Sequence, residues 1–176
     1  MNNPMFRDLR ADEIECRVAQ ATQYGVSLLL YKDARCDMNI LDETVGSMNW
    51  MRSHTRENAN CIVSLWDAEK NCWISKEDTG TESNTEKEKG LASDSFKRAC
   101  FNWGIGRELY TAPQIKIGAE NCEALKQYGD KWKCFDTFEV QKIIIENKRI
   151  VALAIRNSKS RKTVYIWQHP NWNKPE

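Results

Sequence analysis

The chain has 176 residues, of which 41% are hydrophobic, and a formal net charge of +1. This length suits one domain, or one domain with an appendage, with room for a sizeable core. The sequence contains no run of about 18 apolar residues, which excludes a membrane-spanning helix, and residues 1–13 lack the apolar centre of a signal peptide. We therefore expect a cytoplasmic protein, in the host cytoplasm if the chain is phage-encoded.

Cysteine spacing argues against a zinc site. The seven cysteines form no Cys-x-x-Cys pair, and neither of the two histidines lies close to paired cysteines, whereas zinc sites usually use close ligand pairs. We expect free thiols, mostly buried in a reducing compartment, with no bound metal and no cofactor.

The small net charge hides an uneven distribution. Residues 141–162 contain seven Lys or Arg and one Glu, giving +6, so the rest of the chain sums to −5. Such a separation suits a polyanionic partner, and it also suits the solvated face of a hairpin. Charge alone favours neither interpretation.

The first half of the chain predicts alternating short elements. Residues 6–20 are read as a short helix and residues 26–31 as a strand. Asp33 can cap a helix that runs to Val45, and Gly46 is a natural stop. Within that helix one buried face is marked by Met38, Leu41 and Val45.

Two strands and a polar loop follow. "NCIVSLW" and "CWIS" read as strands joined by the turn "DAEKN". The stretch "KEDTGTESNTEKEK", residues 76–89, is polar and is read as a mobile loop.

The segment from Glu88 to Tyr110, "EKGLASDSFKRACFNWGIGRELY", predicts a long helix that Gly104 ends. With a period of 3.6 residues, Asp94 can pair with Arg98 one turn later. Its "GIG" closes a helix rather than opening one, so it is not a dinucleotide fingerprint. One stripe of the helix is apolar and a neighbouring one is partly basic: the first comprises Ala92, Phe96, Ala99 and Trp103, the second Lys89, Ser93 and Lys97.

After Tyr110 the character of the sequence changes. Residues 114–132 read as a connector with one helical turn, residues 133–168 as a three-stranded antiparallel meander with turns at "ENKR" and "NSKSRK", and residues 169–176 as a flexible tail.

Three ordered segments resemble the Rad fifty-two/twenty-two family of single-strand annealing proteins, in its bacteriophage and bacterial branch. They are "KGLASDSFKRACFNWGIGRELY", "EIECRVAQ" and "DARCDMNILDETVGSMNW". The resemblance runs from about Phe6 to Pro113, roughly two-thirds of the chain. In "EIECRVAQ", the family more often has an aromatic residue at the position of Cys16.

The resemblance implies an α+β fold. Residues 1–113 would form a β-β-β-α annealing core, with a curved antiparallel sheet over a long helix, and the C-terminal meander would follow. Subunits would assemble into a homo-oligomeric ring or arc with a basic outer groove for single-stranded DNA. The implied function is annealing of complementary strands in homologous recombination and double-strand break repair, with no cofactor and no enzymatic activity. Implied candidate partners are a single-strand binding protein and an exonuclease.

The resemblance also assigns the DNA-binding positions. The basic positions deep in the groove fall on Arg17, Lys97 and Arg98, with Lys89 at a basic position earlier in the helix. Eukaryotic relatives have a further Arg three residues after the Lys-Arg pair, where this chain has Phe101, so the groove is either less basic there or uses Phe101 against a neighbouring subunit. An annealing protein must leave bases free to pair, so core or subunit-interface roles are expected for Trp50, Trp66, Trp73 and Trp103.

Two other functions remain as alternatives. A protein that coats and protects single-strand ends without annealing would need the same basic groove. A metal-dependent nuclease would need two or three converging carboxylates, and its candidates are Asp67, Asp78, Asp94, Asp136 and Glu139. The one Glu-x-Lys motif, Glu146-Asn147-Lys148, falls in a predicted turn, and the turn accounts for it better.

Overall fold

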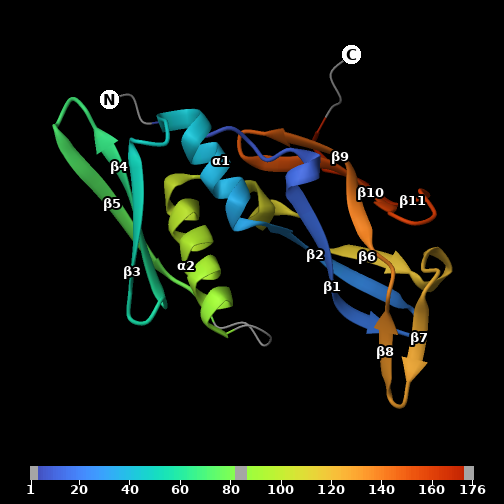
Figure 1. Cartoon of the computed structure of the whole chain (residues 1–176). Coiled ribbons are helices and arrows are strands. Elements are labelled where there is room, and N and C mark those ends of the chain that lie inside the picture. Colours follow the sequence, from blue (N-terminus) through green and yellow to red (C-terminus); the bar gives the residue numbers. More distant parts are fainter. Residues whose placement is uncertain (1–3, 82–86, 173–176) are drawn as a thin grey trace. The chain divides into compact units, whose positions relative to one another are not determined.

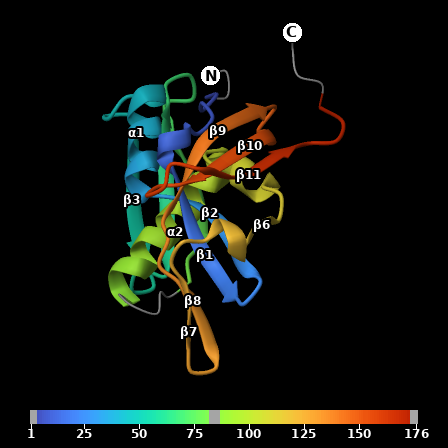
Figure 2. The ribbon, with the colours of Figure 1, turned by 90° about the vertical axis from the view of Figure 1, so that its right-hand side faces the viewer.

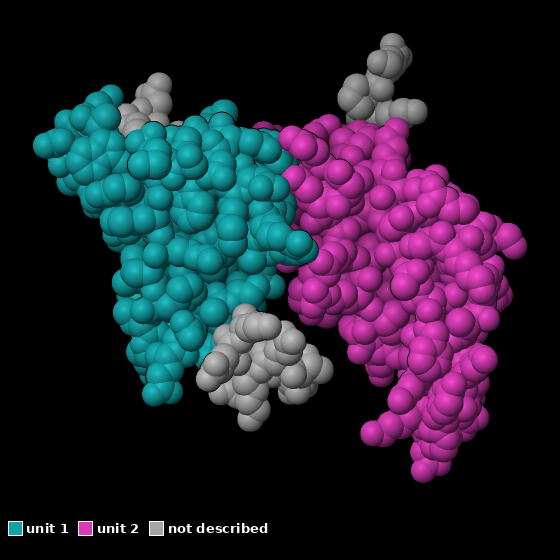
Figure 3. All heavy atoms as spheres, viewed as in Figure 1, with its two compact units in different colours: residues 1–8, 33–106 teal, residues 9–32, 107–176 magenta. Residues whose placement is uncertain are grey.

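The computed structural model describes residues 4–81 and 87–172, with the backbone alone for residues 87–89. The chain divides into two compact units (Figure 3). Unit 1 comprises residues 1–8 and 33–106, and unit 2 comprises residues 9–32 and 107–176. The predicted boundary at residue 113 therefore falls inside unit 2. The fold is α+β, as predicted.

Unit 1 is a three-stranded antiparallel sheet, in the order β3-β4-β5, with two helices (Figure 1). Helix α2 packs on β4 and β5, and α1 contacts α2 and β3. The core of the unit includes Leu41, Val63, Leu65 and Phe96. The elements are α1 (Ala34–Val45), β3 (Trp50–Thr55), β4 (Asn60–Asp67), β5 (Cys72–Thr79) and α2 (Lys87–Trp103).

The predicted limits of α1 are confirmed. The Asp33 carboxylate accepts a hydrogen bond from the backbone N–H of Arg35 at 2.7 Å, and Gly46 ends the helix with φ +84°. The buried stripe is offset from the predicted one, because Ile40 joins Leu41 in the core while Met38 and Val45 are only half-buried.

Unit 2 contains a six-stranded antiparallel sheet in the order β11-β10-β9-β1-β2-β6. The sheet curves until its edge strands approach each other, and the Tyr165 hydroxyl of β11 donates to the carbonyl of Gln114 beside β6 at 3.4 Å. Ile117, Leu153 and Ile155 are among the core residues inside the curve. The strands of this sheet are β1 (Ile14–Thr22), β2 (Gly25–Lys32), β6 (Ile115–Gly118), β9 (Phe138–Glu146), β10 (Arg149–Asn157) and β11 (Thr163–Gln168).

The helix predicted at residues 6–20 is wrong. Only a short 3-10 helix, η1 (Ala11–Glu13), precedes β1. From Ile14 onward apolar and polar residues alternate, which is the period of a strand. Strand β1 pairs with β2 along almost its whole length, and on its other side it pairs with β9 at Glu15 and Cys16. The C-terminal meander is confirmed as three strands, and through β9 it joins the N-terminal strands.

The predicted connector, residues 114–132, is also more ordered than expected. It contains β6, which pairs with β2, then η3 (Ala119–Asn121) and β7 (Leu125–Tyr128). Strand β7 forms a hairpin with β8 (Lys131–Cys134), and this hairpin projects from the six-stranded sheet (Figure 2). The buried alternation of Ile115 and Ile117 is the sequence signal that marks β6 as a strand.

Two predicted flexible segments are partly ordered. Residues 76–79 of the polar loop belong to β5, residues 82–86 lie outside the described part, and α2 begins at Lys87. In the tail, the Trp172 indole is 9% exposed and donates to the Glu146 carboxylate at 2.7 Å. Residues 173–176 lie outside the described part.

Candidate nucleic-acid interface

Helix α2 carries the predicted Lys97-Arg98 pair on a rigid support. Phe96, immediately before the pair, and Ala99, immediately after it, are fully buried. The Phe96 ring stacks with the indole of Trp50 on β3, with ring centroids 6.1 Å apart. The predicted apolar stripe of the helix therefore anchors the backbone from which both cations extend, and Gly104 ends the helix with φ +101° as expected.

Lys97 keeps its charge available. Its side chain is half-buried, and within residues 4–81 and 90–172 the ammonium has no hydrogen-bond or ion-pair partner. Its charge acts on Asp33, whose pKa is lowered chiefly by hydrogen bonds from Arg35 and in smaller part by the charge of Lys97. An unpaired cation on a fixed backbone is suited to an anionic ligand.

Arg98 does not pair with Asp94, contrary to prediction. Its Nε lies 3.3 Å from the Asp78 carboxylate, because β5 runs beside α2 and brings Asp78 to the helix. Asp94 instead accepts hydrogen bonds from the backbone N–H and hydroxyl of Thr81, at 2.9 Å and 3.2 Å. The Arg98 side chain is 44% exposed, and Asp78 partly offsets its charge.

Lys89 and Arg17 are placed less directly. The backbone of Lys89 lies in the first turn of α2, and its side chain is outside the described residues. Arg17 is on β1, with its side chain 57% exposed, ion-paired with Glu15 at 2.6 Å and stacked over the Tyr31 ring at 4.8 Å. Arg17 belongs to unit 2 and Lys97 to unit 1. Lys97 and Arg98 are neighbours on one helix.

Two cations beside α2 were missed from the sequence. Arg52 on β3 is exposed and stacks over the Phe96 ring at 4.7 Å. Lys76 on β5 stacks over the Trp103 ring at 4.4 Å and donates to the carbonyl of Asn102 at 2.9 Å. Alternation along "WMRSHT" would have placed Arg52 on the same face as Trp50. Arg52 thus lies against the residue that precedes the Lys97-Arg98 pair, while Lys76 is held at the end of the helix.

The tryptophans predicted as core or interface residues have structural partners. The Trp50 indole donates to Asp42 at 2.6 Å, and the Trp103 indole donates to the Val63 carbonyl at 3.0 Å. Trp66 and Trp73 meet edge to face with centroids 5.4 Å apart. The other three tryptophans are half-buried, whereas Trp73 is 38% exposed.

The basic C-terminal meander is less positive than its sequence suggests. Glu139, on β9, accepts from the guanidinium of Arg156 and from that of Arg161, the latter at 2.7 Å. Including this carboxylate lowers the charge of the segment from +6 to +5. Two of its seven cations are therefore committed to one acidic partner.

The acidic residues weighed for a nuclease have separate partners. Asp67 accepts from the backbone N–H groups of Glu69 and Lys70, whereas Asp78, Asp94 and Glu139 bind the groups described above. The described residues contain one group of three potential metal ligands, which comprises Cys122, Cys134 and Asp136.

All seven cysteines are free thiols. Cys36, Cys61 and Cys100 are buried and Cys72 is exposed, while the remaining three are intermediate. Free thiols are confirmed, although fewer than half of them are buried.

Comparison with known proteins gives no relative. No protein-family model matches the chain, and no match was found among the curated proteins or the solved structures. Within the described residues, no helix combines the length and apolar character needed to cross a membrane.

Proposed function

We propose that this protein binds single-stranded DNA without sequence preference and promotes annealing of complementary strands in homologous recombination and double-strand break repair. The observation that carries the proposal is Lys97. Among the residues that the structure describes, its ammonium makes no hydrogen bond or ion pair, and it extends from a buried and rigid stretch of helix inside the segment that resembles the single-strand annealing family. Two more cations support the proposal: Arg98 follows Lys97 on the helix, and Arg52 stacks on the ring of Phe96, which precedes it.

The arrangement of unit 1 supports this function. Three antiparallel strands are followed by the long helix α2, which is the β-β-β-α order that the resemblance implies. Lys and Arg side chains bind phosphates without reading sequence, as an annealing protein requires. Trp50 and Trp103 are engaged in hydrogen bonds inside unit 1, so DNA bases bound here would remain free to pair with a second strand.

A charge-matched pair of variants tests the role of Lys97. Lys97→Ala and Lys70→Ala each remove one positive charge from unit 1, but Lys70 is 68% exposed in the β4–β5 turn and lies 3.6 Å from Asp67. We expect Lys97→Ala to weaken single-strand binding and to flatten its salt dependence by about 0.7 in log–log slope for each phosphate that is no longer bound. Lys70→Ala should bind like the wild type. Equal binding of both variants at every salt concentration would contradict the proposal.

Arg17 and Arg98 rank below Lys97 for a structural reason. Glu15 and Asp78 partly neutralise them, and each must give up its carboxylate partner to bind a phosphate. We therefore expect Arg17→Ala and Arg98→Ala to weaken binding less than Lys97→Ala does, with folding unchanged.

Mixing complementary strands and timing duplex formation distinguishes annealing from simple coating. Tight binding without acceleration would make the protein an end-protecting or coating protein. Magnesium-dependent cleavage of labelled DNA would instead indicate a nuclease.

We further propose that the protein works as a homo-oligomeric ring or arc. Strands β3 and β5 are the edges of the unit 1 sheet, and edge strands offer unpaired backbone groups to another subunit. An oligomer would repeat Lys97 along a bound strand, so a substitution that removes one phosphate ligand from each subunit removes many from the complex. Light scattering at micromolar protein, with and without DNA, should show a large assembly, and a monomer under both conditions would refute this arrangement.

A further inference from the structure

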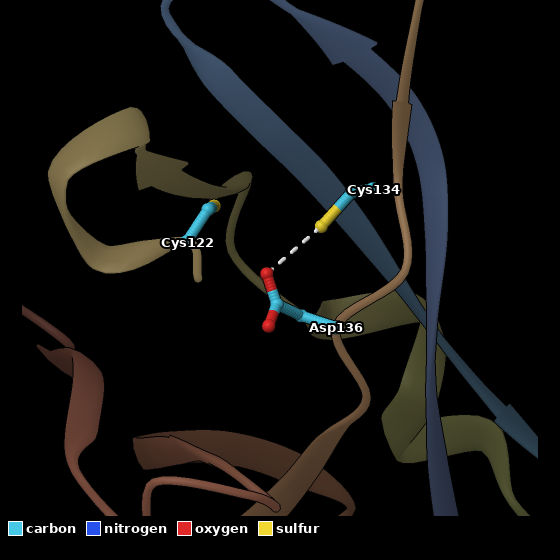
Figure 4. Close-up of side chains that lie close together, drawn as sticks. All are labelled: Cys122, Cys134 and Asp136. Atoms are coloured by element: carbon cyan, nitrogen blue, oxygen red, sulfur yellow. Dashed lines mark hydrogen bonds between the residues drawn. The ribbon is translucent and has the colours of Figure 1, made fainter. Parts of the chain in front are cut away.

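Two sulfurs and a carboxylate meet at the base of the β7–β8 hairpin. Cys122 directly follows η3, Cys134 is the last residue of β8, and Asp136 lies between β8 and β9. Their ligand atoms, the two Sγ and one carboxylate oxygen, all lie within 4.8 Å of one another. Figure 4 shows the three side chains turned toward a common space.

The spacing of the three ligand atoms is close to that of a tetrahedral metal site. With zinc–sulfur bonds of about 2.3 Å and zinc–oxygen bonds of about 2.1 Å, tetrahedral ligands lie about 3.8 Å apart for two sulfurs and about 3.6 Å for sulfur and oxygen. The Cys134 sulfur is already 3.3 Å from the Oδ2 of Asp136. Shifts of a few tenths of an ångström to about one ångström would bring all three atoms into coordination distance.

The carboxylate is held in place by a separate set of hydrogen bonds. The Oδ1 of Asp136 accepts from the amide of Asn157, a fully buried residue, at 3.0 Å. Its Oδ2 accepts from the backbone N–H of Ala124 at 2.9 Å. Partners of this kind orient a ligand and are a regular feature of metal sites. Burial alone would raise the pKa of Asp136, but hydrogen bonds from Ala124, Asn157 and Cys134 outweigh burial and lower it.

The donor set selects the class of metal. Two sulfurs and one oxygen suit zinc and its chemical relatives, whereas Mg²⁺ and Ca²⁺ require a shell of oxygens. Burial raises the pKa of Cys134 to about 12 and also raises that of Cys122, so without metal both sulfurs carry protons near neutral pH.

We propose that Cys122, Cys134 and Asp136 form a binding site for one Zn²⁺ ion, with water as the fourth ligand. On binding, each thiol releases its proton to solvent and the two resulting thiolates bind the ion together with the Asp136 carboxylate. Because Cys122 precedes β7 and Cys134 ends β8, the ion would join the two ends of the projecting hairpin. This inference does not depend on the proposed DNA function.

Cobalt substitution tests the site directly. The full-length chain, reduced and stripped of metal, is titrated with Co²⁺ and then with Zn²⁺. We expect one Co²⁺ per chain, with thiolate-to-cobalt charge-transfer absorption and tetrahedral visible bands, both removed by one equivalent of Zn²⁺. Zn²⁺ should also raise the melting temperature of the wild type.

Single substitutions assign the ligands. Cys122→Ser and Cys134→Ser should each abolish the tetrahedral spectrum, and Asp136→Asn should weaken binding about tenfold or more. The matched control is Cys72→Ser, at the exposed cysteine, which should leave binding unchanged. Circular dichroism checks the fold of each variant. If Cys134→Ser does not fold, Cys122→Ser and Asp136→Asn carry the test, because Cys122 is only half-buried and Asp136→Asn keeps the shape of its side chain.

Three results would overturn the proposal. The first is a reduced wild type that gives no charge-transfer band, and the second is a band that survives Cys122→Ser. The third is a Cys122–Cys134 disulfide, found by peptide mapping of air-exposed protein, whose reduced form binds no metal. The third result would identify the cysteines as an oxidisable pair instead.

Discussion

Substitution of Asp33 should separate its two roles, which are capping α1 and placing a negative charge near Lys97. Its Oδ1 accepts the backbone N–H of Arg35 at 2.7 Å, and its Oδ2 pairs with the Arg35 guanidinium at 2.6 Å. Loss of an N-cap costs about 1 kcal/mol. The ion pair adds little, because the Arg35 side chain is 84% exposed. We expect Asp33→Ala to lower the free energy of unfolding by about 1 kcal/mol, whereas Asp33→Asn, which keeps an acceptor, should cost a few tenths.

Urea unfolding between neutral and acid pH measures this effect. The pKa of Asp33 is lowered in the folded protein, chiefly by hydrogen bonds from Arg35. The stability contributed by the ionised carboxylate is therefore present above the unfolded pKa of 3.8 and is lost as pH falls through the lower folded value. The difference between wild type and Asp33→Ala should shrink over that acid range. If Asp33→Asn is as unstable as Asp33→Ala at neutral pH, charge rather than capping is the dominant role.

The same substitution bears on DNA binding. Asp33→Asn removes a negative charge that interacts with Lys97, so single-strand affinity should rise by up to about fivefold at 0.1 M salt, the effect of one additional bound phosphate. In a Lys97→Ala background the increase should disappear, because the two residues are coupled. An increase of equal size in both backgrounds would show that the effect does not pass through Lys97.

Three further variants test the packing and the charge assignment. Phe96→Ala should lower the free energy of unfolding, measured by urea titration, by about 3–5 kcal/mol, because the Phe96 side chain is fully buried. A decrease below about 1 kcal/mol would contradict its place in the core. Gly25→Ala should unfold unit 2, because φ at this position is +135° and an added Cβ would lie 2.0 Å from the Ile117 carbonyl oxygen. Thermal melts measure this effect, and a melting temperature equal to that of the wild type would show that β2 and β6 are not so closely paired. Reversal of charge at Arg149 and Lys159 should leave strand annealing within about twofold of wild type in an assembled protein, and loss of annealing would move the DNA groove to the meander.

Local sequence was sufficient where neighbours in the chain determine structure. Asp33 and Gly46 predict both ends of α1, and Phe96 with Ala99 predicts the buried face of α2. The same local reasoning failed at Arg98. Its partner is Asp78, twenty positions away on β5, rather than Asp94 at the preferred helical spacing, since the packing of α2 against a strand outweighed a weak intrahelical pair.

Contacts between distant segments could not be predicted. Strand β1 pairs with β9, more than a hundred residues away in the sequence. No local feature of the sequence around Ile14 indicates which strand will be its partner. Cys122, Cys134 and Asp136 likewise lie together because the antiparallel β7–β8 hairpin brings the residues before β7 next to those at the end of β8. Sequence rules for metal sites look for pairs of ligands a few residues apart. Cys122 and Cys134 are twelve residues apart, so these rules do not detect them.

The nested order of the two units has a consequence for biosynthesis. Most of unit 1, residues 33–106, is made before the strands that complete unit 2, so it can fold while the ribosome is still translating. Until then β1 lacks its later partner β9 and β2 lacks its later partner β6, so each exposes an unpaired edge that is prone to aggregation. A stalled or prematurely ended chain would then contain a folded unit 1 together with β1 and β2, which are the first two strands of the unfinished sheet of unit 2. In such a truncated chain the exposed strand edges belong to the β1–β2 hairpin near the N-terminus, although the residues that are missing are C-terminal. We therefore expect chaperones and proteases to recognise mainly this hairpin.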